Sequence, residues 1–337
     1  MTASFDSDPG TSYVTDMTAW SGGFIAIGSA WDSAHHVDRE RPVVWVSPDG
    51  EAWEEQPVEL GTDDASLVGI APRLDGTLLL IGQVPGLGGG SFDKPEPRSG
   101  AWLSEDAITW QAVDLPVSAI VDSFDHGPMG YALTAGGELW FSPDGIEWEM
   151  TYEGVARVVA GEEGFVALRS LETAASSSVV ASGDGQSWFE SQETAAPLLD
   201  VAPMGGDWVA IAARSDPLGI DISHSPNGLD WTVTLEVNDL TGPDGPKTGR
   251  GLEYDSISGA ELTGGAGLAF VTLTNNHCCA QMPWNFGIWA TSDGTSWEPV
   301  VEGDAFVSSA VSSTDATVLA GHLRRGEDAA FWMSVAP

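Results

Sequence analysis

The chain of 337 residues carries 50 acidic and 12 basic side chains, which gives a formal charge of −38 at pH 7. Nucleic acid is not expected as a partner, because a phosphate backbone needs clustered cations, and anionic membrane surfaces are disfavoured for the same reason. Disorder is not expected either, since 42% of the residues are apolar and 15 are tryptophan. No apolar run approaches the roughly 20 residues of a membrane span.

The first residues, from Met1 to Asp6, do not form a signal peptide. The chain is therefore expected to be either cytoplasmic or a mature or trimmed form. Its acidity suits a salty or extracellular medium, where salt screens self-repulsion. We expect a secreted or extracytoplasmic monomer.

In chain order, the tryptophans recur in the pattern Ser/Thr-x-Asp-Gly-x-x-Trp. The first clear copy runs from Ser47 to Trp53, and others begin at Ser142, Ser182 and Thr291. Degenerate copies begin at Ser104 and Ser225. The motif tryptophans are 38 to 66 residues apart. A period of roughly 40–50 residues with β-type composition is typical of a propeller.

Each copy has the same surroundings. An apolar strand precedes it, Asp-Gly makes a tight turn, and the motif tryptophan begins the next strand, where we expect it to pack between blades. Two further strands lie upstream, such as Tyr13 to Asp16 and Gly23 to Gly28 in the first unit. Four strands per repeat make one propeller blade.

The last unit contains sequence for three strands only, ending at Ser334. Residues Thr2 to Phe5 would supply the missing outer strand and remove an open edge. The fold prediction is therefore an all-β, single-domain, seven-bladed propeller of four-stranded blades, closed by an N-terminal strand. The predicted blades span residues 11–60, 61–116, 117–153, 154–195, 196–240, 255–303, and 304–337 together with 1–8.

This repeat resembles the Asp-box (BNR) repeat of sialidase-like β-propellers. The resemblance covers essentially the whole chain, although Asp and Gly are adjacent here and the usual Asp box has a residue between them. It implies that Asp49, Asp144, Asp184 and Asp293 form structural turns on the face away from the site. The sialidase catalytic set is not evident: there is no Arg-Ile-Pro signature, and neighbouring Glu253 and Tyr254 would point to opposite sides of a strand.

Blade geometry sorts the loops by face. Loops between second and third strands, and loops between blades, share one face, which we call the long-loop face. Ten of the twelve cations, both cysteines and most histidines are assigned to it. We interpret it as a pocket in which arginines hold anionic oxygens and aromatic rings stack on a sugar. The alternative is that cations offset local acidity. The predicted ligand-binding residues are Trp31, His35, His36, Arg39, Arg98, Arg214, Arg250, Trp284, Arg324 and Arg325.

The innermost strands carry a second set of candidates. Counting back from each second strand places Asp16, Gly69, Asp122, Arg157, Asp200, Gly259 and Ser309 at equivalent positions. If they face the axis, their carboxylates would supply a general acid or hold Ca²⁺. The alternative is a solvated polar channel.

His277-Cys278-Cys279 is unusual, because adjacent cysteines do not form a disulfide framework. A vicinal disulfide and free thiols both remain open. A zinc or copper site with His35 and His36 has no supporting ligand spacing, so no metal site is predicted.

Three functions remain. The first is a recognition module that binds a glycan or small anionic ligand. The second is a glycoside hydrolase or polysaccharide lyase, with catalytic candidates Asp16, Asp122, Asp200, Glu40, His277 and Tyr254. The third is an acidic assembly factor with a basic protein partner. The sequence favours them in that order, and requires no cofactor.

Overall fold

Short strands separated by glycine-rich turns make up the whole computed structural model. It describes residues 2–4, 12–31, 40–61, 65–84, 97–169, 178–191, 198–215, 218–237, 259–265, 268–275, 284–301, 305–312, 316–323 and 327–335. Within these ranges, 28 strands form seven four-stranded sheets. Neighbouring strands in each sheet are antiparallel.

The strands of each sheet are given from the inner to the outer one. The first sheet contains β2 (Ser12–Trp20), β3 (Gly23–Trp31), β4 (Glu40–Ser47) and β5 (Glu54–Gln56), and the second contains β6 (Ser66–Pro72), β7 (Leu78–Val84), β8 (Arg98–Ser104) and β9 (Gln111–Val113). The third contains β10 (Val121–Gly127), β11 (Gly130–Ala135), β12 (Glu138–Ser142) and β13 (Glu149–Glu153), and the fourth contains β14 (Val155–Gly161), β15 (Gly164–Arg169), β16 (Val179–Ser182) and β17 (Phe189–Glu190).

The fifth sheet contains β18 (Leu198–Met204), β19 (Asp207–Ser215), β20 (Leu218–Ser225) and β21 (Thr232–Val237). The sixth contains β22 (Gly259–Gly265), β23 (Leu268–Asn275), β24 (Trp284–Thr291) and β25 (Glu298–Val301). The seventh contains β26 (Ala305–Ser312), β27 (Ala316–Leu323), β28 (Glu327–Val335) and β1 (Thr2–Ser4).

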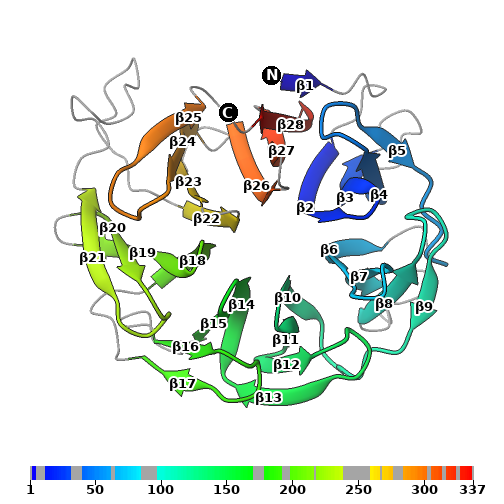
Figure 1. Ribbon diagram of the computed structural model, residues 1–337, viewed down its shortest axis with the longest axis horizontal. Coiled ribbons are helices and arrows are strands. Elements are labelled where there is room, and N and C mark those ends of the chain that lie inside the picture. Colours follow the sequence, from blue (N-terminus) through cyan, green and yellow to red (C-terminus); the bar gives the residue numbers. More distant parts are fainter. Residues whose placement is uncertain are drawn as a thin grey trace, which may run out of the picture.

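The sheets stand radially around a central opening, with the first strand of each next to the axis (Figure 1). Each inner strand contacts the inner strands of the two neighbouring sheets, and β26 contacts β2, so the ring is continuous. The predicted β-propeller with four-stranded antiparallel blades is confirmed. In the last sheet, β1 pairs with β28 and places Ser4 opposite Ala330.

In every described copy of the motif, the side chain at the third position accepts the N–H groups two and three residues later. In the first copy, the Ser47 hydroxyl accepts the Gly50 N–H at 2.8 Å, and Asp49 Oδ1 accepts the N–H groups of Glu51 and Ala52. Gly50 has a φ of 81°, the left-handed region that glycine enters without steric cost. Trp53 Nε1 donates to the Gly50 carbonyl at 3.0 Å. These contacts support the prediction that the motif aspartates form turns.

Apolar side chains fill the space between neighbouring blades. Ile25, Ile27 and Val44 of one blade pack with Leu78 and Leu80 of the next, all fully buried. The motif tryptophan packs between blades, as predicted, and its neighbour is the preceding blade. Trp53, for example, stacks on Phe331 with ring centroids 3.9 Å apart. The core therefore lies in layers between blades, and the inner strands are free to present polar side chains to the axis.

Candidate functional site: the central channel

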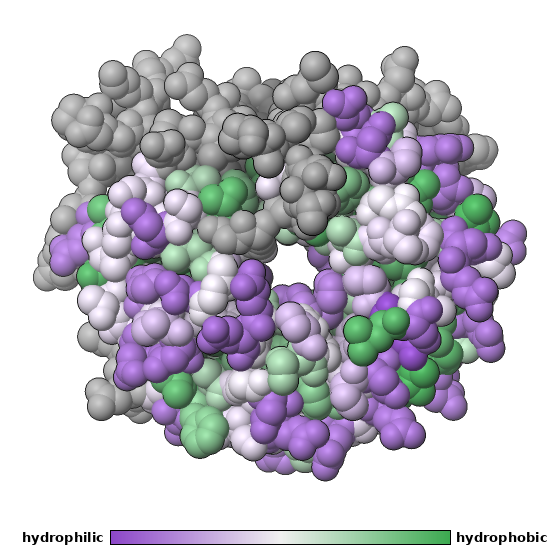
Figure 2. Space-filling view, viewed as in Figure 1, coloured by the Kyte–Doolittle hydropathy of each residue, from purple (hydrophilic) through white to green (hydrophobic). Residues whose placement is uncertain are grey.

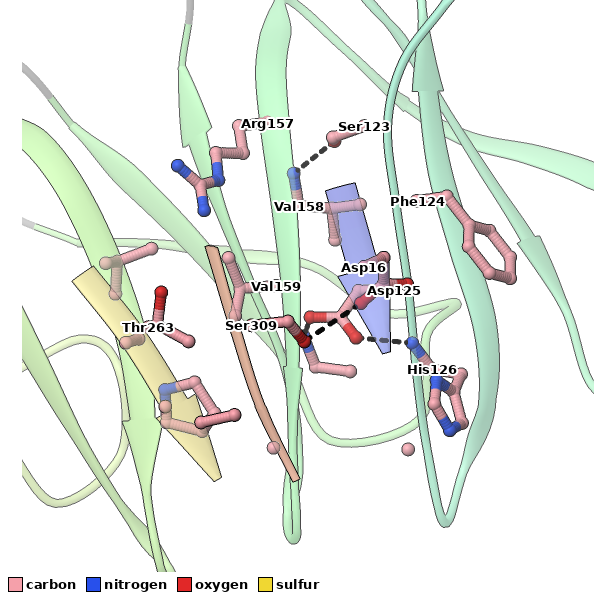
Figure 3. A pocket seen from close by; sticks show the side chains of 18 of the residues that line it. Asp16, Ser123, Phe124, Asp125, His126, Arg157, Val158, Val159, Thr263 and Ser309 are labelled. Carbon is pink, nitrogen blue, oxygen red and sulfur yellow. Dashed lines mark hydrogen bonds between the residues drawn. The ribbon is translucent and has the colours of Figure 1, made fainter. Parts of the chain in front are cut away.

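A cavity of about 750 Å³ lies on the propeller axis, and all seven inner strands contribute to its lining. The space-filling view shows an opening through the centre of the ring (Figure 2). Lining side chains include Asp16, Asp125, His126, Arg157 and Ser309, which Figure 3 labels. The predicted polar channel is therefore present.

A β-bulge in the inner strands decides which side chains are equivalent around this channel. In β2 the register shifts between Val14 and Asp16, and corresponding shifts occur before Gly69, Arg157, Asp200 and Ser309. These five residues therefore occupy equivalent positions, as predicted. At each bulge, two residues of the inner strand lie opposite one residue of the second strand, so the pairing of the residues that follow is shifted by one.

Two of the predicted channel positions are wrong in register, although one of them, Asp122, does line the cavity. In β10 the bulge ends at Ser123, which pairs with Thr134, so Asp122 is one residue away from the equivalent position. Asp122 is exposed and accepts the Gly136 N–H at 3.1 Å. In β22 the equivalent position falls on Glu261 instead of Gly259, because β22 has no bulge in its pairing with β23. Ser123 and Glu261 each lie seven residues before the second strand of their blade, as Asp16 does, so both errors are errors of count.

Asp16 joins its own blade to the next one. Its Oδ2 accepts the Ile70 N–H from β6 at 2.9 Å, and its Oδ1 accepts the Met17 N–H at 2.7 Å. The Ser309 hydroxyl donates to Oδ1 at 3.3 Å from the other side. Burial raises the pKa of Asp16 to about 7, against the opposing effect of the Ile70 hydrogen bond, and the charge of Asp125 raises it further.

Asp200 makes the same connection between β18 and β22. Its Oδ2 accepts the Leu262 N–H at 2.8 Å, and its Oδ1 accepts the Val201 N–H. Arg157 reaches across from β14 to Oδ1 at 2.7 Å. The side chain of Asp200 is 2% exposed and that of Arg157 is 43% exposed. The carboxylate is thus a structural acceptor, while part of the guanidinium faces the channel.

Asp125 and His126 are channel residues that were not among the candidates predicted from the sequence. Asp125 Oδ2 accepts the Ala160 N–H of β14 at 2.9 Å, and Oδ1 accepts the His126 N–H at 2.7 Å. Burial raises the pKa of Asp125 to about 6 and lowers that of His126 to about 4. Asp125 lies two residues beyond Ser123 and so on the same face of β10. Because side chains alternate between the two faces of a strand, Asp125 could have been predicted to face the channel once Ser123 was placed there.

Taken together, the inner strands carry a polar lining in which several carboxylates are already hydrogen-bonded to backbone N–H groups. Within the described ranges, no group of three or more His, Cys, Asp or Glu is placed to hold a metal ion. The calcium alternative therefore has no support from these residues. The same ranges contain no helix with the length and apolar character of a membrane span. The lining suits hydrogen bonding to a polar ligand.

Several predicted residues of the long-loop face lie at strand ends. Trp31 pairs with Glu40, Arg214 with Gly219, and Trp284 with Asn275. Arg98 is exposed at the start of β8, opposite Val84. All of these positions are at the blade end where second strands finish and third strands begin, which confirms that they share one end of the blades.

The other loop candidates fall outside the described residues. They are His35, His36, Arg39, Arg250, Arg324, Arg325, His277 and Tyr254, together with Cys278 and Cys279. Their convergence around the channel mouth stays a prediction, and so does the redox state of the cysteines.

No protein-family model matches the chain, and no curated protein matches it. Solved structures resemble it. Virginiamycin B lyase from Staphylococcus aureus has a TM-score of 0.55 and 11% identity, over 100% of this chain and 99% of that one. The propeller domain of the trilobed protease from Pyrococcus furiosus gives 0.55 and 9%, over 98% and 96%. An ancestral GH74 enzyme gives 0.61 and 13%, over 100% of this chain and 50% of that one. At these identities, the similarity establishes that this chain shares the β-propeller fold.

Proposed function

We propose that the protein is an extracytoplasmic recognition propeller that binds a neutral glycan in the central channel. The observation that carries this proposal is the axial cavity of about 750 Å³ with its polar lining. Pockets for small ligands usually measure 300–1,000 Å³. Sugar hydroxyls both donate and accept hydrogen bonds, so they can pair with carboxylate, hydroxyl and guanidinium groups alike.

The charge of the lining favours a neutral sugar over an anion. Asp16, Asp122, Asp125 and Glu162 line the cavity, with Arg157 as the cation among the described lining residues. An anionic ligand would meet net repulsion there. The alternative of a small anionic ligand rests instead on the cations predicted at the long-loop face. The titrations described next distinguish a neutral ligand from an anionic one.

Titration calorimetry with neutral oligosaccharides, and with sulfated and uronic ones, tests the proposal. The variant Arg157→Lys keeps a cation beside Asp200 but removes the guanidinium fork. We expect it to weaken binding of a neutral sugar about tenfold, a change of ~1.4 kcal/mol. Arg41→Lys is the matched control, because Arg41 pairs with Glu55 on the outermost strand at 2.8 Å. Equal weakening in both variants, or no binding by any neutral sugar, would overturn the proposal.

The long-loop mouth has its own test. Trp284→Ala and Arg250→Ala should weaken the same titration if these loops contribute to the site. If only sulfated or uronic sugars bind, and Arg250→Ala abolishes that binding, the anionic ligand replaces the neutral one. Unchanged binding in both variants would remove the mouth from the site.

One observation supports a second candidate, a carbohydrate-active enzyme. Two carboxyls of raised pKa, Asp16 at about 7 and Asp125 at about 6, face one channel and interact electrostatically. A carboxyl that stays protonated near neutral pH can act as a general acid. Hydrolysis of a bound oligosaccharide that disappears in Asp125→Asn, with sugar binding retained, would establish this activity. Binding without turnover would favour the recognition module.

We also propose that the repeat is a variant Asp box on a closed, seven-bladed ring. The turn contacts of Ser47, Asp49 and Gly50, repeated at Ser182 and Thr291, support the assignment. The pairing of β1 with β28 and the contact of β26 with β2 support closure. Extracytoplasmic location rests on the net charge of −38 and is tested by finding the protein in the medium or periplasmic fraction of its source cells.

A further inference from the structure

Four large apolar side chains stand at the tips of turns on two neighbouring blades. Leu74 lies in the β6–β7 turn and is 97% exposed, while Ile108 of the β8–β9 turn is 47% exposed. Met129 lies in the β10–β11 turn at 44%, and Ile146 in the β12–β13 turn at 47%. All four turns are at the end of the blades opposite the long-loop face. The turns of Leu74 and Ile146 are in contact, and Ile108 and Met129 lie in the flanking turns at the same end; we call these four residues the turn-end patch.

The repeat itself shows that these turns do not require apolar residues. After the motif glycine, where Ile146 stands, other blades have Glu51, Gln186 and Thr295. Leu229 holds that position in the β18–β21 blade but is partly buried against the core. At the tips of the turns between first and second strands, other blades have Gly22, Glu163 or Gly206. The apolar tips are therefore confined to the β6–β9 and β10–β13 blades among the described turns of these two kinds.

Hydrogen bonds hold the turns of the patch in place. Within the β6–β7 turn, Arg73 N–H donates to the Thr77 carbonyl at 2.7 Å, and Thr77 N–H donates to Asp75 Oδ1 at 3.0 Å. Arg73 Nε donates to the Asp144 carbonyl at 2.8 Å, which ties this turn to the turn that carries Ile146. A rigid presentation loses less entropy when a partner binds.

Acidic side chains surround the patch. Asp75, Glu105, Asp106, Asp144 and Glu147 are all exposed in the same turns. Hydrogen bonds from Thr109 and Ile108 lower the pKa of Asp106 to about 2, so it is ionised at neutral pH. Arg73 is the cation of these turns, but its side chain is only 10% exposed and is bonded to Asp75 at 2.8 Å. Figure 2 shows hydrophobic side chains over the β6–β9 blade beside hydrophilic neighbours.

We propose that the turn-end patch docks a basic amphipathic protein segment, in which apolar side chains are flanked by Lys or Arg. Apolar contact would supply affinity, and the acidic rim would supply orientation and a fast, salt-dependent association. A second copy of this chain fits poorly, because each copy carries a charge of −38. An anionic membrane is disfavoured for the same reason. The cavity lining reaches Pro128, next to Met129, but none of the four patch residues lines the cavity, so either proposal can fail alone.

A synthetic amphipathic peptide of leucine and lysine is the probe, and an equally charged peptide of serine and lysine is its control. Fluorescence anisotropy should show that the leucine peptide binds the wild-type protein at least about tenfold more tightly than the serine peptide. In the double variant Leu74→Ser/Ile146→Ser, we expect that advantage to disappear. The double variant Phe189→Ser/Val233→Ser removes exposed apolar groups from other blades and should retain it.

Three results would overturn the proposal. The first is equal binding of both peptides to the wild-type protein, which would leave general charge attraction as the whole effect. The second is an equal loss in the patch and control variants. The third is self-association or membrane binding through the patch. Sedimentation would then show a dimer of the wild-type protein but not of the patch variant, or the wild-type protein but not the patch variant would float with neutral phosphatidylcholine vesicles. A melting temperature equal to that of the wild-type protein would show that the patch variant remains folded.

Discussion

At the scale of single residues, aspartate has two opposite roles in this chain. In the motif turns it is exposed, and several N–H donors stabilise its charged form. At Asp16 and Asp125 in the channel it is partly buried, and this desolvation favours its neutral form despite similar donors. The pKa of Asp184 is lowered to about 2 by hydrogen bonds from Ser187 and Gln186, while that of Asp16 is raised to about 7 by burial. The same side chain therefore makes opposite contributions to the pH dependence of stability.

The turn role predicts the effect of Asp144→Ala. Asp144 Oδ1 accepts the N–H groups of Ile146 and Glu147 at 2.8 and 3.0 Å. Losing this acceptor resembles losing a helix N-cap, so the free energy of unfolding should fall by about 1 kcal/mol. Glu147→Gln in the same turn is the control and should change stability by less than about 0.5 kcal/mol. Urea titration measures both. Equal effects would mean that Asp144 is a surface charge and not a turn former.

The channel role predicts a loss of stability with rising pH. Between pH 4 and 7 the folded protein holds a proton on Asp16 that the unfolded chain, with a pKa near 3.8, has released. The folded state then binds more protons, so the free energy of unfolding falls as pH rises through this window. Asp16→Asn should flatten that fall in urea titrations from pH 4 to 7. An unchanged slope would show that the Asp16 carboxyl is ionised throughout.

Asp200 has a larger predicted effect on stability than Asp144. Asp200→Ala leaves the N–H groups of Leu262 and Val201 without their acceptor and removes the partner of Arg157. The expected loss is about 2–4 kcal/mol. Asp200→Asn retains one acceptor oxygen and should lose less. If both variants unfold at the same denaturant concentration as the wild type, the inter-blade hydrogen bonds contribute nothing measurable.

At the scale of strands, glycines let the second and third strands of a blade approach each other. A Cβ on Gly164 would lie 2.1 Å from the Ser182 carbonyl oxygen, whereas one on Gly137 would meet nothing within 4 Å. Both have positive φ, at 141° and 86°. Gly137→Ala therefore measures backbone strain alone, about 1–2 kcal/mol. Gly164→Ala adds overpacking of about 1–3 kcal/mol. Equal losses in thermal unfolding would contradict the close approach.

Much of the fold could be predicted from the sequence because the motif turn is local. Ser47, Asp49 and Gly50 bond to one another within a few residues, so their order alone indicates the turn and the strands on either side. The channel could be predicted only in part. Asp122 was assigned in place of Ser123 because the count back from the second strand was one residue too long, and Asp125 was missed because a single position was taken from each inner strand. The apolar residues at the turn tips are recognisable in the sequence only when the same position is compared between repeats.

At the scale of the whole molecule, three residue pairs between β1 and β28 join the start of the described chain to its last strand. Deleting residues 1–10 should lower the melting temperature and expose the edge of β28, whose backbone groups can then pair with another chain. We expect concentration-dependent association by light scattering. A matched substitution of Gly61 by Ala, where a Cβ meets nothing within 4 Å, should not cause association. A monomeric deletion variant of unchanged melting temperature would mean that β1 does not close the ring.

The most direct test of the central claim is a titration in which the channel is filled by a side chain. Thr263 lines the cavity on β22, so Thr263→Trp should occupy it. If the neutral sugar binds in the channel, calorimetry should show binding weakened by at least about tenfold, a change of ~1.4 kcal/mol, while thermal unfolding stays near that of the wild type. Undiminished binding by the folded Thr263→Trp variant would contradict a sugar site in the channel.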